Sequence, residues 1–431
     1  MPRHVAPPLV MFILAVSAGA GLIPSPAPGR TLAQPAPAPQ LPGTYVLNLS
    51  TGTVLSVGGV LASGFSPETA WSPDGSRLAV AGSPDESGSG GGLQIVDLAG
   101  GATVVATAEQ GRASQLAFSP DGSRLAFIFE GAIGPITVDS PALYIWPVSG
   151  GAARQMLSAG VLTFAWTPDS AAITVSQFLP GPSMDAPSGR MVTLDARSGD
   201  VINTPLQGEN ATCAVGLAWS PDGAYLAYGG SGFHQGCGTD PNGFGLWSWE
   251  AAAGTSTRLF TGTAAAPLWQ ADGSILDTVA GTTDPSALPI SLRSFRPDGS
   301  GSTILVDSIS NQFPAPDNLF QTAAGVVMYG LSGCDAASAW VIDPGSTPRR
   351  LSAPSVFAYR PQLSPDGRTV AWVAVGSSSS DLVLAAEDGS SARMVLSGAS
   401  GMTMSPGAWS PDGTALVFAV TAEQATDCLP E

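Results

Sequence analysis

The stretch "AWSPDGSRLAV", Ala70–Val80, decides the fold, because it reads as two apolar segments joined by a tight turn. Pro73 presets one backbone angle, the Asp74 side chain bonds neighbouring backbone, and Gly75 supplies a left-handed position. The same turn returns along the chain after an aromatic residue or Leu. The copies begin at Trp71, Phe118, Trp166, Trp219, Trp269, Leu363 and Trp409. A repeat at a fixed period indicates one architecture built of similar units.

The spacing of the copies gives their number. Most gaps lie between 46 and 53 residues, and the gap from Trp269 to Leu363 is 94, which is two periods. Inside that long gap lies "LFQTAAGVVMYG", Leu319–Gly330, with Phe320 in the aromatic place and the turn motif lost. We interpret it as a degenerate copy, which gives eight.

A second type of hairpin alternates with the first. Examples are "YVLNLSTGTVLSV" (Tyr45–Val57) and "LQIVDLAGGATVVA" (from Leu93), and "FRPDG" at Phe295 belongs to this type rather than to the first. The first hairpin is apolar and aromatic, which predicts an inner position, buried on both faces. The second alternates apolar with polar residues, which predicts an outer position.

Four strands per period predict an all-β, eight-bladed β-propeller of four-stranded antiparallel blades. The chain opens with the outer hairpin Tyr45–Val57 and ends with an inner one, Gly407–Val420, so the two are expected to share one blade and close the ring. Closure would remove exposed strand edges. The alternative is seven blades, if the copy at Phe320 is not a full blade. Each aromatic residue before a turn is expected to pack between neighbouring blades, which is worth about 1.5–3 kcal/mol when fully buried.

The repeats resemble a known family. "AWSPDGSRLAV…LQIVDLAGG" and "LAFSPDGSRLAFIF…LYIWPVSGG" are similar to the WD-repeat-like propeller repeat of the TolB C-terminal domain and of the prolyl-oligopeptidase and dipeptidyl-peptidase propellers. The resemblance covers residues 45–431 and implies the fold, while propellers serve many functions. No GxSxG nucleophile motif and no α/β region accompany the repeats, so peptidase chemistry is not expected.

The N-terminal region predicts export. Arg3 and His4 precede the apolar run Leu9–Ile23, with Ala18-Gly19-Ala20 as a cleavage site, so residues 1–23 read as a signal peptide. An uncleaved anchor is the alternative. Residues 24–43 are a Pro-rich linker, expected to be extended and unpacked, and residues 44–431 are the propeller. The expected location is periplasmic, on the cell surface, or secreted.

The charge restricts the partners. A formal charge of −17 over 431 residues disfavours nucleic acid and anionic membrane surfaces, which require a basic face. We therefore expect no nucleic-acid partner, no membrane insertion of the mature domain, a monomeric state, and a protein partner in the envelope or outside the cell.

Cysteine and histidine usage limits the chemistry. In an exported chain, Cys213 and Cys237 are expected to form a disulfide in neighbouring loops, and pairing of Cys334 with Cys428 stays open. No CxxC pair appears, so zinc is not expected. Once the signal is removed His234 is the sole histidine, which removes the usual general base and metal-ligand sets.

Binding is expected at the irregular loops that join the second and third strands of each blade, opposite the Ser-Pro-Asp-Gly turns. The candidate binding residues are Asp139, Asp185, Phe233, His234 and Asp240. No catalytic residue or cofactor is assigned. Calcium held by loop carboxylates is an alternative, although no DxDxDG spacing appears.

The sequence thus predicts a noncatalytic, TolB-like propeller that acts as a protein-interaction scaffold. Two alternatives stand beside it. One is a carboxylate-dependent enzyme acting on polysaccharide, since two carboxylates suffice for glycoside cleavage. The other is a module that binds a small ligand or calcium.

Overall fold

The structure is a computed structural model that divides into two units, Met1–Gln34 and Pro35–Glu431. All residues that it describes belong to the second unit. The described residues are 36–39, 41–58, 68–82, 92–99, 103–107, 110–133, 136–179, 188–207, 214–230, 245–264, 267–281, 290–307, 319–321, 327–331, 338–342, 349–350, 357–375, 380–386 and 390–421.

Every regular element among the described residues is a β-strand. The first half holds β1 (Ala36–Pro37), β2 (Gly43–Asn48), β3 (Val54–Gly58), β4 (Glu68–Trp71), β5 (Arg77–Gly82), β6 (Gly92–Asp97), β7 (Thr103–Thr107), β8 (Gln110–Phe118), β9 (Arg124–Ile133), β10 (Ile136–Pro147), β11 (Arg154–Leu157), β12 (Val161–Trp166), β13 (Ala172–Leu179), β14 (Ser188–Asp195), β15 (Val201–Gln207), β16 (Ala214–Trp219) and β17 (Tyr225–Gly230).

The second half continues the pattern. It holds β18 (Gly245–Glu250), β19 (Thr255–Thr261), β20 (Thr263–Ala264), β21 (Leu268–Trp269), β22 (Ile275–Ala280), β23 (Ile290–Phe295), β24 (Ser302–Val306), β25 (Leu319–Gln321), β26 (Val327–Leu331), β27 (Ser338–Ile342), β28 (Arg349–Arg350), β29 (Phe357–Leu363), β30 (Thr369–Val375), β31 (Ser380–Ala386), β32 (Arg393–Ser397), β33 (Thr403–Trp409) and β34 (Ala415–Thr421).

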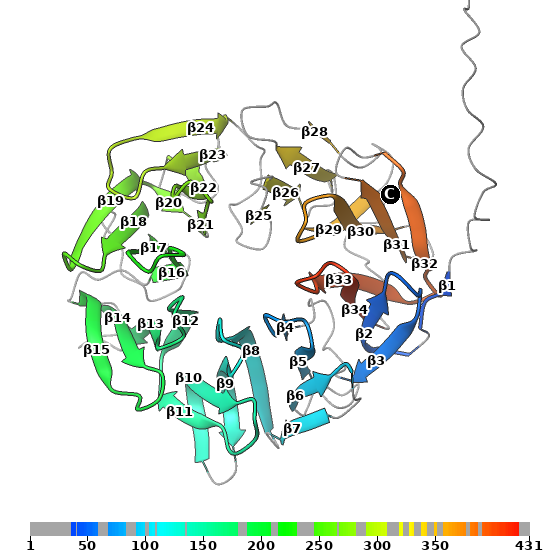
Figure 1. The fold of residues 1–431 in the computed structure, drawn as a ribbon, viewed down its shortest axis with the longest axis horizontal. Coiled ribbons are helices and arrows are strands. Elements are labelled where there is room, and N and C mark those ends of the chain that lie inside the picture. Colours follow the sequence, from blue (N-terminus) through cyan, green and yellow to red (C-terminus); the bar gives the residue numbers. More distant parts are fainter. Residues whose placement is uncertain are drawn as a thin grey trace, which may run out of the picture. The chain divides into compact units, whose positions relative to one another are not determined.

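Most sheets follow the chain as two consecutive hairpins, which give four strands each (Figure 1). Seven sheets in the described part are antiparallel; in one of them β20 and β21 both pair with β22, so the inner strand is split. The degenerate copy forms β25 and β26, with Phe320 opposite Met328. "FRPDG" joins β23 to β24, the outer hairpin of its sheet. This all-β architecture is consistent with a β-propeller.

One sheet combines the two ends of the repeat region. β2 pairs antiparallel with β34, from Gly43 opposite Val420 to Asn48 opposite Ala415, and the sheet runs β3-β2-β34-β33. The outer hairpin at the start and the inner hairpin at the end therefore complete one four-stranded sheet. This pairing lets the first and last segments stabilise each other although more than 350 residues separate them.

The end of the predicted linker is packed rather than free. β1 adds to the edge strand β32 in parallel, Ala36 opposite Leu396 and Pro37 opposite Ser397. The Ala38 amide donates to the Ser397 carbonyl at 2.8 Å, and the Ala38 side chain is buried. Proline suits such an outermost strand, where its missing N–H can face away from the ladder. The expectation of an unpacked linker thus fails for residues 36–38.

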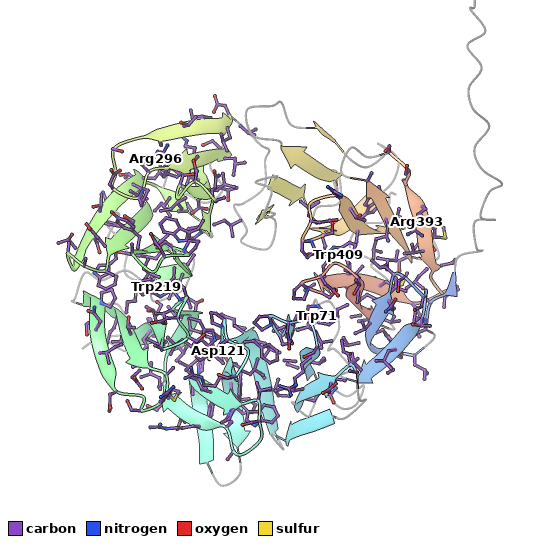
Figure 2. The ribbon with its side chains drawn as sticks, viewed as in Figure 1. Trp71, Asp121, Trp219, Arg296, Arg393 and Trp409 are labelled. Atoms are coloured by element: carbon purple, nitrogen blue, oxygen red, sulfur yellow. The ribbon has the colours of Figure 1, made fainter. Side chains whose placement is uncertain are left out.

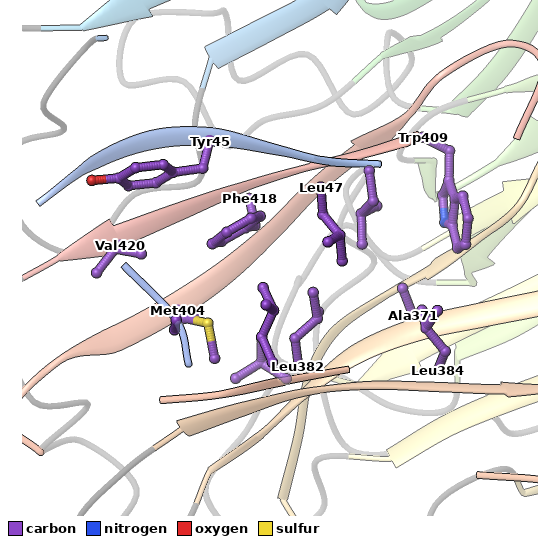
Figure 3. Packing of buried hydrophobic residues seen from close by; sticks show 13 residues of the cluster. Tyr45, Leu47, Ala371, Leu382, Leu384, Met404, Trp409, Phe418 and Val420 are labelled. Carbon is purple, nitrogen blue, oxygen red and sulfur yellow. The ribbon is translucent and has the colours of Figure 1, made fainter. Parts of the chain in front are cut away.

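Apolar side chains hold neighbouring sheets together. Figure 3 shows one cluster, where Leu47 and Phe418 of the shared sheet face Ala371, Leu382 and Leu384 of the sheet β29–β32. Equivalent clusters join β4–β7 to β8–β11 and β8–β11 to β12–β15. The sheet β8–β11 therefore buries both faces, which matches the nearly continuous apolar strands of the first hairpins.

Ser-Pro-Asp-Gly turns or close variants close the inner hairpins of seven sheets in the described part at one end, which we call the turn end. The opposite end is the loop end. In the first copy the Gly75 amide donates to the Ser72 carbonyl at 2.9 Å, and Gly75 has φ 71°. That angle favours glycine. A methyl group on Gly75 would lie 3.6 Å from Pro411 Cδ, so consecutive turns touch across neighbouring sheets.

Candidate functional site

The predicted loop-end site falls mostly outside the described residues. Asp185, Phe233, His234 and Asp240 all lie there, and so do Cys213, Cys237, Cys334 and Cys428. Asp139 lies in β10, at an irregularity of its pairing with β9 between Val138 and Ala142. The binding assignment and the Cys213–Cys237 disulfide therefore stay predictions, and the pairing of Cys334 with Cys428 stays open.

Two loop-end carboxylates that border this region are described. Glu130 is exposed at the far part of β9. Asp381 accepts a hydrogen bond from the Gly398 amide at 3.0 Å, so it fixes the start of β31 against the chain after β32. Asp381 thus has a structural role.

No group of three or more His, Cys, Asp or Glu side chains that could hold a metal ion occurs within the described ranges. In that part of the chain, no helix combines the length and the apolar character needed to cross a membrane.

Most of the turns that close the inner hairpins are described, and their carboxylates are held in a repeated geometry. The Ser72 hydroxyl donates to Asp74 Oδ1 at 2.6 Å, and the Ser76 amide donates to the same oxygen at 3.0 Å. These bonds lower the pKa of Asp74 to about 2, the Ser72 hydroxyl contributing most. Asp121 has the same arrangement with Ser119, which likewise lowers its pKa to about 2.

Four tryptophan side chains each link an inner strand to the inner strand of the preceding repeat. Nε1 of Trp71 donates to the Ala408 carbonyl at 3.1 Å, and Nε1 of Trp409 donates to the Gln362 carbonyl at 3.2 Å. Trp166 and Trp269 make the same bond. Each donates to the carbonyl of the residue that directly precedes the aromatic residue of the previous repeat. Figure 2 shows Trp71, Trp219 and Trp409 on inner strands, whereas Arg296 and Arg393 lie toward the outer strands.

A pocket opens at the turn end between the shared sheet β3-β2-β34-β33 and the sheet β4–β7. Its volume is about 410 Å³. Trp71, Leu55 and Leu98 give it apolar walls, and Asn48 and Asp412 give it polar ones. We call it the seam pocket.

The polar wall of the seam pocket carries a negative charge. Asp412 Oδ1 accepts from the Ser410 hydroxyl at 2.6 Å and from the Thr414 amide at 3.0 Å. The Ser410 bond is the main reason why the pKa of Asp412 is lowered, so the carboxylate is ionised at neutral pH. Trp71 is half-buried, and its indole N–H is already bonded to Ala408, which leaves the ring face as the surface that it offers.

We call the contact between two neighbouring sheets a seam. At the seam between β8–β11 and β12–β15, a side chain fills the space that corresponds to the seam pocket. Arg124 lies with its guanidinium carbon 5.3 Å from the centre of the Trp166 ring, and its Nη2 donates to the Ser170 carbonyl at 2.6 Å. The positive charge of Arg124 also contributes to the lowered pKa of Asp121. A cation therefore lies over an indole face at this seam, and a turn carboxylate lies near enough to be affected by its charge.

Sequence reasoning directed attention to the loop end and missed the seam pocket. The seam pocket joins residues from both ends of the repeat region, Asn48 and Trp71 with Asp412 and Ala415. The sequence feature that could have indicated the pocket is the first strand residue after each turn. It is Arg124 in one copy and Ala415 in another. Its meaning depends on which aromatic ring lies next to it.

Comparisons with known proteins support the fold. No protein-family model matches the chain, and no curated protein matches it either. A structure of oligogalacturonate lyase in complex with manganese is 14% identical with a TM-score of 0.52, covering 73% of this chain and 87% of that one. A structure from a study of two prolyl endopeptidases is 14% identical with a TM-score of 0.55, covering 83% and 54%.

A TolB relative is also among the similar structures. The putative TolB from Agrobacterium tumefaciens is 17% identical, covering 88% of this chain and 97% of that one. Its TM-score of 0.36 is too low to support a conclusion about the fold. This chain spans about half the length of the prolyl endopeptidase chain that it matches. At these identities the matches show a shared fold, consistent with a β-propeller, and nothing about activity.

Proposed function

We propose that this chain is an exported, noncatalytic, eight-bladed β-propeller that presents its loop end to another protein of the cell envelope or outside the cell. The sheet shared by β2 and β34 carries the proposal, because it joins the first and last segments and would close the ring into a rigid scaffold. The sheet β25–β28 supports eight blades rather than seven. The signal-like run Leu9–Ile23 supports export.

A rigid scaffold suits binding at the loop end. Irregular connections between well-packed strands commonly carry recognition, since the strands hold them in place. In the described part of the chain, inner-turn aspartates such as Asp74 and Asp412 use Oδ1 to accept from a hydroxyl of their own turn. That oxygen serves the turn, and the loop end is the more variable surface.

The proposal is tested by capture from native envelope. The full chain with an affinity tag is expected to retain a specific protein. A variant in which Asp139, Asp185, Phe233, His234 and Asp240 are all replaced by Ser is expected to lose it. The matched control is Ser300→Ala, an exposed turn-end residue on an outer hairpin, which should capture as well as the parent chain.

The rival functions give different results in the same preparation. Recovery of no protein partner, together with cleavage of a polysaccharide that stops on Asp139→Asn or Asp185→Asn, would replace the scaffold by a carboxylate-dependent enzyme. Calcium binding by calorimetry that those variants abolish would favour the small-ligand module instead. The likeness to oligogalacturonate lyase makes oligogalacturonate the first substrate to test.

A further inference from the structure

Because the sheets are repeats of one another, equivalent positions at two seams can be compared. In the sheets β8–β11 and β12–β15, the turn after Phe118 ends at Arg124, whose guanidinium covers Trp166. In the shared sheet the turn after Trp409 ends at Ala415, and the ring next to it is Trp71. Arg124 and Ala415 hold the same place in their hairpins, because each directly precedes a Leu that pairs with the aromatic residue, Leu125 with Phe118 and Leu416 with Trp409.

The groups that surround Arg124 have counterparts around the seam pocket. Asp121, whose carboxylate interacts with Arg124, corresponds to Asp412. Ser170, whose carbonyl accepts from Arg124 Nη2, corresponds to Gly75. Asp412, Gly75, Trp71 and Ala415 all line the seam pocket.

A further seam shows that this place takes planar side chains. Tyr225 follows the turn after Trp219, and its ring centre lies 6.4 Å from that of Trp269, with the planes 33° apart. Ala415 is too small to reach the neighbouring ring, so the space that Arg124 or Tyr225 fills elsewhere remains as the seam pocket, with a volume of about 410 Å³.

We infer that the seam pocket binds a guanidinium group from outside the chain. This group lies against Trp71, Asp412 and the Gly75 backbone, in the position that corresponds to that of the Arg124 guanidinium at its own seam. An indole face attracts a cation through its quadrupole. A carboxylate and a carbonyl then satisfy the planar N–H donors that arginine presents. The net charge of −17 favours arrival of a cation.

This site is at the turn end, so it holds whether or not the loop end binds a protein. Its ligand is either an arginine side chain of a partner chain or a small free guanidine, and both share the chemistry that the pocket recognises. The remaining walls, Leu55 and Leu98, give room for the aliphatic stem that leads to an arginine head group.

Ligand-observed NMR with the full chain tests the inference. N-acetyl-argininamide is expected to bind, and its neutral isostere N-acetyl-citrullinamide to bind about ten-fold more weakly or not at all, because it lacks the charge that Trp71 and Asp412 recognise. Asp412→Asn should weaken the arginine probe by about ten-fold. An Ac-Gly-Arg-Gly-amide peptide that binds as well as the single residue indicates a protein side chain as ligand, and a peptide that is excluded indicates a free guanidine.

Two substitutions exchange the residue types at the two equivalent positions, 415 and 124, and act as controls for each other. Ala415→Arg should fill the seam pocket from within, as Arg124 does at its seam, and abolish probe binding with no loss of thermal stability. Arg124→Ala should empty the place over Trp166 and add a second site for the same probe. The inference is overturned if the parent chain does not bind the arginine probe, if the citrulline probe binds equally, or if Ala415→Arg binds the arginine probe as the parent chain does.

Discussion

At the scale of single residues, the hydroxyl of the first turn residue is the centre of most inner turns, and that residue is Ser119 in the second copy. Ser119 is fully buried; its Oγ donates to Asp121 Oδ1 at 2.5 Å and accepts from the Arg124 amide at 3.0 Å. One small side chain thus joins the start of the turn, its carboxylate and the strand that leaves it. Proline and glycine only permit this geometry, whereas the serine and the aspartate bind it together.

Ser119→Ala is expected to lower the free energy of unfolding by about 1–3 kcal/mol, because the Arg124 amide loses its side-chain acceptor. The control is Ser123→Ala, since Ser123 is exposed and its amide bond to Asp121 remains; its effect should stay within about 0.5 kcal/mol. Urea unfolding measures both. Equal losses for the two variants would contradict this role of the hydroxyl.

The same turns predict acid resistance. The folded pKa of Asp74 and of Asp121 is about 2, below the ordinary value near 4, and the other inner-turn aspartates in the described part are shifted the same way. A depressed folded pKa gives stability that is complete above the ordinary pKa and is lost as the pH falls through the folded one.

The melting temperature is therefore expected to hold from pH 7 to about pH 5 and to fall between about pH 4 and pH 2. Thermal scans at these values check it. Asp121→Asn, which cannot ionise, should fall less steeply over the acid range than the parent chain. A parent chain that loses most of its stability between pH 7 and pH 5 would show that other groups dominate.

At the scale of elements, the indole rings couple sheets that lie next to each other. Trp409 is nearly buried, and its N–H reaches from β33 to the Gln362 carbonyl of β29. Trp146 makes a bond of the same kind to Gly151, but within its own hairpin. The two side chains therefore separate coupling between sheets from stability inside one sheet.

Trp409→Phe should lower the free energy of unfolding by about 1–2 kcal/mol, because it leaves the Gln362 carbonyl without its indole donor. Hydrogen exchange should then speed up in both β33 and β29. Trp146→Phe is the control, with faster exchange expected in β10 and β11 alone. Exchange confined to β33 in the Trp409 variant would speak against coupling between sheets.

At the scale of the whole repeat region, stability depends on the shared sheet. β34 contributes Val417 and Phe418 to two different clusters, one on each face of that sheet. Removing β33 and β34 would expose both neighbouring faces together with one edge of β2. A sheet with free edges and an uncovered apolar face tends to associate with other chains.

A chain that ends at Ala399 lacks β33 and β34, and it is expected to be insoluble or to elute as an oligomer in size-exclusion chromatography. The control ends at Thr421, which keeps every described strand and should elute as the parent chain does. A soluble, well-folded monomer from the shorter chain would remove the basis for ring closure.

The sequence by itself determined the hairpins, their inner and outer types and the pairing of the two ends, because the turn at Trp71 and its copies fix strand positions locally. It also located the copy at Phe320 and set apart the turn at Phe295. These features depend on short-range turn chemistry and on alternating polarity, both of which can be read along the chain.

Only the tertiary structure decided the rest. Ala38 packs beside β32, Ser170 accepts from Arg124, and Ala415 leaves a pocket over Trp71. All three are relations between segments that lie far apart along the chain. The local sequence around the first strand residue after a turn is the same whether an aromatic ring or solvent lies next to that residue. What it does is fixed by the sheet packed against it, and packing is a property of the folded chain.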